Sequence, residues 1–240
     1  MLSLFFLVSK QAVSQVTITS PATSVNSNTD GTTYSFGSFT PTAGSILVVF
    51  VVATGTVQTN PTITNTGTTL TWTLDAAQIV SGAGYYIFWA RVPATVSASI
   101  VTFNCTTDGP DGINMSIFSC ANTNRFSSDP LIQTKISTTG TTSANATITF
   151  DNVLRPRSGY IVAWAGLFTG NTNSTPPTGF TEVGDLGRNA PARNFSAATR
   201  NGGLTTAGPI TFTNASTTWV VMGAEVDWVK RDMPPSLLEN

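Results

Sequence analysis

The stretch Ser45-Ile-Leu-Val-Val-Phe-Val-Val52 decides the fold class that this sequence predicts. It follows a Gly44-Ser45 turn, and every residue from Ile46 onward is apolar. A strand with one solvated face would alternate between apolar and polar residues, and this run does not. We therefore expect Ile46–Val52 to be a central strand that is covered on both faces.

A second stretch, Thr69-Leu-Thr-Trp-Thr-Leu74, alternates strictly. Successive side chains of a strand point to opposite faces of the sheet. The pattern predicts that Leu70, Trp72 and Leu74 lie on a buried face and that the threonines point to solvent.

The rest of the chain repeats signals of this kind. Short runs rich in β-branched and aromatic residues are separated by clusters of Gly, Asn, Pro and Thr, and no convincing amphipathic helix occurs. We expect an all-β fold, an antiparallel β-sandwich. The clearest strands are expected at Ser45–Ala53, Thr68–Leu74, Tyr85–Val92, Ser99–Cys105, Ile113–Cys120, Leu131–Ser137, Ala146–Phe150, Tyr160–Leu167, Phe180–Val183, Asn194–Thr199, Ile210–Thr213 and Trp219–Val226.

Residues 16–121 and 130–228 repeat each other loosely. Each half has a Gly or Ser turn before a long apolar strand, a Pro-containing loop, a Gly-led strand and a final apolar strand, in the same order. The spacing between matched positions drifts too much to prove duplication. No glycine-rich linker separates the halves, and each offers only five or six strands. We therefore expect one interleaved sandwich over residues 16–228, with arms at 1–15 and 229–240.

The order of these strands resembles a known kind of module. Ser45-Ile-Leu-Val-Val-Phe-Val-Val52, Leu70-Thr-Trp72, Tyr85-Tyr-Ile-Phe88 and Ile100-Val-Thr-Phe103 together are similar to concanavalin-like jelly rolls of bacteriophage virion proteins and bacterial surface proteins. The resemblance covers roughly Val16 to Val226. It implies a jelly roll with an exterior binding or structural role, and it carries over no catalytic residue.

Composition limits the chemistry that the chain can perform. It has no histidine, so the commonest general base and the commonest metal ligand are absent. A net charge of −1 gives nothing with which to neutralise a phosphate backbone, and no nucleic-acid partner is expected. Ser and Thr make up about a quarter of the residues. Such a neutral surface hardly repels other copies, which fits either a protein packed against neighbours or simply a Thr-rich exterior.

Both ends of the chain carry apolar residues outside the expected sandwich. The run Leu2–Val8 lacks a preceding Lys or Arg, unlike a secretory signal, and it is far shorter than the roughly 20 residues that span a bilayer. We expect a buried N-terminal strand at Ser3–Ser9 and a docked C-terminal arm, because untethered termini fray. The residues expected at an assembly interface are Leu2, Leu4, Phe5, Phe6, Trp228, Leu237 and Leu238.

The two cysteines and the densest acidic stretch can each be explained by structure alone, without a functional role. Cys105 and Cys120 end consecutive expected strands, and in a simple hairpin their Cα atoms would lie beyond the roughly 7 Å that a disulfide allows, so free thiols are expected. Asp108-Gly-Pro-Asp111-Gly offers oxygen ligands to a hard cation such as calcium, but it also reads as turn chemistry and lacks regular ligand spacing. No metal or cofactor is expected.

Two pairs of carboxylates could serve glycoside hydrolysis. These are Glu182 with Asp185, and Glu225 with Asp227, whose i, i+2 spacing places both on one face of a strand. Strand-end charges on the surface are the alternative, and we expect no enzyme.

Aromatic and basic residues leave further alternatives open. Tyr85, Trp89, Trp164 and Trp228 could form a platform on which sugar rings stack, or they could lie in the core. The only basic concentrations suit an interface or ordinary loops. They are Arg155 with Arg157, and Arg188 with Arg193 and Arg200.

Two functions follow from these observations. The first is a structural virion protein of a bacteriophage, exposed on the virion surface, which decorates, cements or projects from the capsid or tail. It would pack against other virion subunits as a homo-oligomer, a trimer or larger, with no membrane partner. The alternative is a carbohydrate-binding or adhesive module that recognises a surface glycan.

Overall fold

The computed structural model describes residues 15–55, 60–105, 110–123, 128–139, 141–166, 174–189 and 192–228. All regular secondary structure in these ranges is β-strand, and every strand pair is antiparallel, so the predicted all-β antiparallel sandwich is confirmed. Within these ranges no helix has the length and apolarity needed to cross a membrane. The expected arms, with Leu2, Leu4, Phe5, Phe6, Leu237 and Leu238, lie outside the described residues.

The first half of the chain forms one large sheet and one small sheet. The large sheet has the order β1-β9-β4-β7-β6, with β2 also paired to β9, and the small sheet has the order β3-β8-β5. These strands are β1 (Thr17–Thr19), β2 (Val25–Ser27), β3 (Thr33–Ser35), β4 (Ile46–Gly55), β5 (Thr62–Asn65), β6 (Trp72–Val80), β7 (Ala83–Arg91), β8 (Val101–Asn104) and β9 (Pro110–Ala121).

The second half repeats this arrangement. Its large sheet has the order β10-β16-β12-β14-β13, and its small sheet pairs β11 with β15. A single bridge between Thr175 and Thr213 adds a third segment beside β15, where the first half has β5 beside β8. These strands are β10 (Leu131–Thr138), β11 (Ser143–Ile148), β12 (Gly159–Gly166), β13 (Thr181–Asn189), β14 (Ala192–Asn201), β15 (Ile210–Thr217) and β16 (Trp219–Val226).

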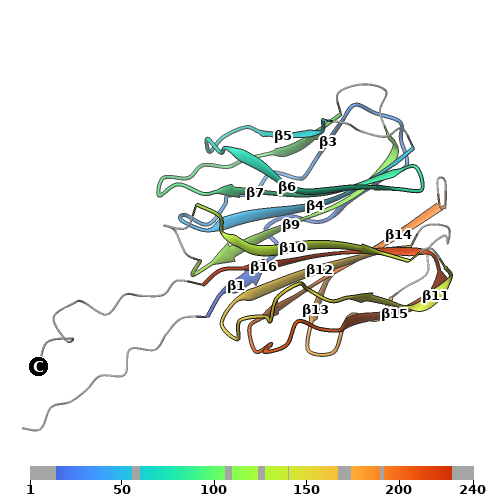
Figure 1. The fold of residues 1–240 in the computed structure, drawn as a ribbon. Helices are drawn as coiled ribbons and strands as arrows, with labels where there is room; N and C mark the ends of the chain where they lie inside the picture. Colours follow the sequence, from blue (N-terminus) through green and yellow to red (C-terminus); the bar gives the residue numbers. More distant parts are fainter. Residues whose placement is uncertain are drawn as a thin grey trace, which may run out of the picture.

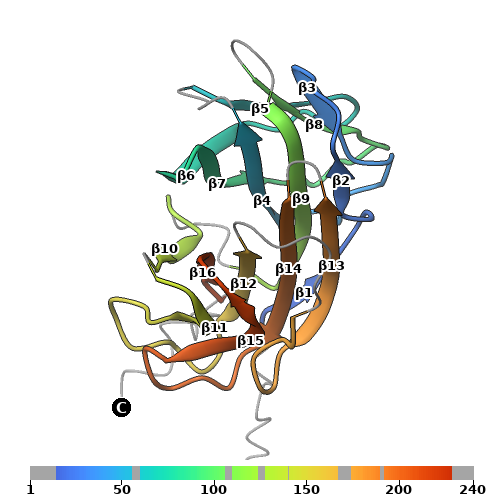
Figure 2. The same cartoon turned by 90° about the vertical axis from the view of Figure 1, so that its right-hand side faces the viewer.

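The four sheets stack as four layers, small, large, large and small (Figure 1). The two large sheets lie face to face in opposite order, because β6 contacts β10 at one margin while β2 contacts β13 and β1 contacts β14 at the other. Two similar sandwiches are therefore related by an approximate two-fold rotation. Figure 2 shows β9 and β13 where the halves meet, and a Cβ at Gly184 of β13 would lie 3.7 Å from Oγ of Ser116 in β9.

Every described sheet takes its strands from one half only, so the halves do not interleave as the sequence analysis expected. The reason lies in the connections. The hairpins β6–β7 and β13–β14 and the central strands β4 and β12 find pairing partners within their own half, and close segments pair at low entropic cost.

Three hydrophobic cores fill the spaces between the four layers. The alternation of β4 supplies two of them: Ile46, Val48, Phe50 and Val52 enter the core between the large sheets, and the side chains between them enter the core under the small sheet. Strand β4 lies between β7 and β9 and is almost wholly buried, as predicted for Ile46–Val52. The third core lies between the second large sheet and β11–β15 and contains Trp164.

The prediction for the Thr69–Leu74 stretch is partly wrong. Leu70 and Trp72 are half-buried, but Leu74 is 42% exposed. The strand begins only at Trp72 and runs to Val80 at the margin of its sheet, with a register shift between Leu74 and Ala76. A marginal strand is covered less completely than a central one, which explains the exposure of Leu74.

Both cysteines are free thiols, as predicted. The hairpin assumed for them does not exist, because β8 belongs to the small sheet and β9 to the large one. Burial raises the pKa of both thiols, that of Cys105 to about 11. Cys120 is fully buried and Cys105 is half-buried.

Candidate functional site

A groove lies between β5 and the start of β6, and we call it the Trp72 groove. Its volume is about 590 Å³. The half-buried indole of Trp72 and the exposed side chain of Leu74 provide apolar surface, and Phe88 beneath them is almost fully buried. The rest of the lining is neutral: Pro61, Thr62, Ile63, Thr64, Asn65, Gly67, Thr68, Thr69, Leu70 and Thr71.

The indole of Trp72 is held in place by a hydrogen bond. Its Nε1 donates to Oδ1 of Asn65 at 3.1 Å. The amide nitrogen of Asn65 in turn donates to the carbonyl oxygens of Thr66 and Thr68, at 3.1 and 2.5 Å. The polar atoms of both side chains are thus used within the protein, and the half-buried indole packs against the core while it lines the groove.

The loop that leads into Trp72 is fixed to the neighbouring chain segment. Thr68 donates from its backbone nitrogen to Oγ of Ser99 at 3.1 Å, and its hydroxyl donates to the carbonyl of Ser97 at 2.9 Å. Gly67 has a φ of +75°, and a Cβ there would lie 1.9 Å from the carbonyl oxygen of Ala98. This tight approach requires glycine, and it holds the loop in one conformation.

A second groove lies on the other side of the same loop, and we call it the Trp89 groove. Its volume is about 510 Å³, and Thr69 and Thr71 line both grooves, so the loop forms a threonine ridge between them. Trp89 is half-buried, and the guanidinium carbon of Arg91 lies 5.6 Å from the centre of its ring. The second groove therefore carries a cation, unlike the first.

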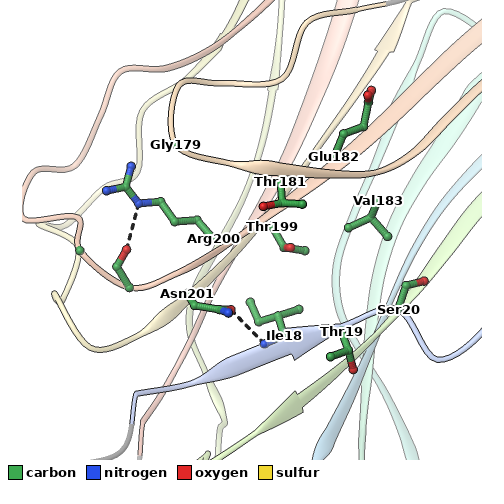
Figure 3. Close-up of a pocket in the computed structure, with 12 residues that line it drawn as sticks. Ile18, Thr19, Ser20, Gly179, Thr181, Glu182, Val183, Thr199, Arg200 and Asn201 are labelled. Carbon is green, nitrogen blue, oxygen red and sulfur yellow. Dashed lines mark hydrogen bonds between the residues drawn. The ribbon is translucent and has the colours of Figure 1, made fainter.

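A larger groove of about 880 Å³ lies between the two halves of the molecule (Figure 3). Its walls are the end of β1 and the facing ends of β13 and β14, with Thr19, Thr181 and Thr199 among the lining residues. Oδ1 of Asn201 accepts a hydrogen bond from the backbone nitrogen of Ile18 at 3.0 Å, which joins the halves. The guanidinium of Arg200 donates to the carbonyl of Gly202 at 2.9 Å, so Nε of this cation is bound to backbone.

The carboxylate pairs singled out from the sequence have structural partners. Glu182 lines the junction groove and accepts a hydrogen bond from Ser196 at 3.0 Å, but its carboxylate points away from Arg200 (Figure 3). Burial, and then the charge of Glu182, raise the pKa of Asp185. Asp185 does not line that groove in the described part of the chain.

The second pair, Glu225 and Asp227, secures the loop before β12. Glu225 is fully buried and accepts hydrogen bonds from the backbone nitrogen of Arg155 at 2.8 Å and from Gln133 at 2.7 Å. Asp227 forms an ion pair with the guanidinium of Arg155 at 3.4 Å. None of the grooves described above includes this pair.

Arg188 and Arg193 face each other across the β13–β14 hairpin and are both about 95% buried. Arg188 reaches across to the first half, where it donates to the carbonyl of Ser27 at 2.7 Å and to the hydroxyl of Thr54. Burial, and then the charge of Arg193, lower the pKa of Arg188 to about 10. These arginines lie inside the molecule, at the interface between its two halves.

The aromatic residues that the sequence offered as a platform are divided between core and surface. Tyr85 and Trp164 are fully buried. Trp89 and Trp228 are half-buried, and the guanidinium carbon of Arg157 lies 5.0 Å from the centre of the Trp228 ring. Trp72 is not among these candidates, because the alternation of its strand predicted a buried face for it.

Among the described residues no group of three or more metal-ligating side chains occurs. Asp111 is exposed, while Asp108 of the candidate calcium stretch lies outside the described ranges. Comparisons with protein-family models, with curated proteins and with solved structures find no match for this chain.

Proposed function

We propose that this chain is a structural virion protein of a bacteriophage that acts by packing against neighbouring copies of itself. In this role it decorates, cements or projects from the capsid or tail. The support from the sequence is its nearly neutral, hydroxyl-rich composition and its similarity to virion modules of the jelly-roll kind.

The observation that carries the proposal is the outer margin of β6. Among the described residues this strand pairs only with β7, so its other edge offers unpaired backbone donors and acceptors. Beyond the register shift it reads Ala76-Ala-Gln-Ile-Val80, with no charge and with Ile79 43% exposed. The register shift between Leu74 and Ala76 interrupts the start of this edge, but Ala76–Val80 carries no Lys or Pro, the residues that commonly protect an edge from pairing with another strand. We assign this edge to a second copy of the chain.

Light scattering over a concentration series tests the proposal. We expect the full chain to form a stable species larger than the monomer and Ile79→Lys to shift it to the monomer, because a lysine on the edge opposes strand pairing. Val153→Lys is the matched control, since Val153 is also exposed, at 66%, but lies in the loop after β11. The control should assemble like the unaltered chain.

Circular dichroism of the variants should show an unchanged β-spectrum. A chain that is monomeric at all concentrations, or an Ile79→Lys variant that assembles normally, would count against the proposal.

A further inference from the structure

We propose that the Trp72 groove is a binding site for an uncharged carbohydrate, with one sugar ring lying on the indole of Trp72. The groove lies at the start of β6, next to the assembly edge at Ala76–Val80, but this inference does not depend on assembly. It assigns the alternative function expected from the sequence to a definite surface.

The chemistry of the lining selects the ligand class. A pyranose ring has an apolar face of C–H groups and a rim of hydroxyls, and it requires an aromatic ring bordered by hydrogen-bonding groups. The groove offers that combination. The indole of Trp72 and the side chain of Leu74 supply the apolar surface, and the hydroxyls of Thr62, Thr69 and Thr71 are exposed beside it.

The uncharged lining of the Trp72 groove indicates that the sugar it binds is neutral rather than charged. No acidic or basic side chain lines the Trp72 groove in the described part of the chain. A sulfated, phosphorylated or uronic-acid sugar would lose hydration there without gaining a counter-charge. A neutral sugar has no such cost, so the ligand is neutral.

The groove is fixed in shape before any ligand arrives. Asn65 holds the indole at one edge, and the hydrogen bonds of Thr68 to Ser97 and Ser99 hold the threonine ridge. A ring and hydroxyls that are already immobilised lose little conformational entropy on binding, and this raises affinity at a given contact area.

The test is binding of the full chain to an immobilised panel of neutral oligosaccharides built from glucose, mannose, galactose or N-acetylglucosamine, beside charged glycans. We expect retention by at least one neutral member and a loss of at least about tenfold in affinity for Trp72→Ala. Trp228→Ala is the matched control, because Trp228 is also half-buried but stacks with Arg157 away from the groove. Its binding should be unchanged.

A second variant keeps the test decisive if Trp72→Ala does not fold. Thr71 is exposed, so Thr71→Arg should block the groove without disturbing the core, and it should reduce binding by a similar factor. Failure of all neutral glycans to bind, preferential binding of charged glycans, or full binding by both variants would overturn the inference. Retained binding by Ile79→Lys would show that the site works independently of assembly.

Discussion

At the residue scale, the most unusual groups are the two arginines of the β13–β14 hairpin. Two buried like charges repel each other, and burial and this repulsion together lower the pKa of Arg188. Its forked guanidinium nevertheless spans the junction, since it donates to Ser27 and Thr54 of the first half from a strand of the second. Asn26 reaches the other way and donates to the carbonyl of Gly187 at 2.9 Å. This end of the molecule is therefore closed by polar contacts between the halves.

We predict that Arg188→Ala lowers the free energy of unfolding by about 2–4 kcal/mol, because it leaves a cavity and an unsatisfied carbonyl at Ser27. Denaturant titration measures the change. Arg155→Ala is the control: its side chain is 54% exposed and forms a single ion pair with Asp227, so the cost should stay below about 1 kcal/mol. Equal effects of the two substitutions would refute a special role for Arg188.

At the element scale, glycines decide how closely the sheets approach. Gly223 lies in β16, and its missing side chain faces the small sheet of the second half. A Cβ at this position would lie 2.7 Å from Cζ of Phe150 and 2.8 Å from Cδ1 of Ile148. Both neighbours are buried in the third core and have little room to move.

We predict that Gly223→Ala destabilises the protein by about 1–3 kcal/mol through overpacking. Gly37→Ala provides the comparison, because a Cβ at Gly37 would have no atom within 4 Å. Its unfolding free energy should stay within about 0.5 kcal/mol of the unaltered value. A tolerated Gly223→Ala, measured by thermal and chemical unfolding, would mean that β11 and β15 can shift away from the large sheet.

Strong periodic runs made the long strands predictable. The runs at Ser45–Ala53 and Trp219–Val226 match β4 and β16 closely, because buried strands need uninterrupted apolar sequence. The short strands β1, β2, β3 and β5 were not foreseen, since three or four residues hold too little periodicity to stand out. Their positions depend on partners far along the chain.

The candidate site was harder to predict than the fold. Alternation around Trp72 identified a strand face but not the place of that strand within its sheet, and β6 is marginal rather than central. The groove also needs Asn65 and Thr62 from β5, which the sequence did not mark as a strand. A Trp between threonines in a Gly-bordered stretch was the one signal that could have indicated it.

At the scale of the whole molecule, the two sandwiches depend on a shared core. The inner faces of both large sheets meet there, with Phe50 and Phe118 from one half and Phe195 and Met222 from the other. Each half alone would expose this apolar face to water, which favours aggregation.

We predict a single cooperative unfolding transition in calorimetry, because neither half retains a complete core without the other. In a chain divided between residues 125 and 126, the two pieces should co-purify when expressed together and aggregate when expressed apart. Two separate transitions, or one soluble and folded piece, would show instead that the halves are independent domains.

The two outer faces of the four-layer stack are not equivalent. Its two small sheets form opposite outer faces (Figure 1). The small sheet of the first half borders the Trp72 groove, whereas Phe180-Thr-Glu-Val183, the stretch that corresponds to the Trp72 strand, contributes Glu182 to the groove between the halves. The two ends of the molecule therefore have the same architecture but different surface chemistry. Two copies that pair through their β6 edges to form one continuous sheet would therefore present the same end to the same side.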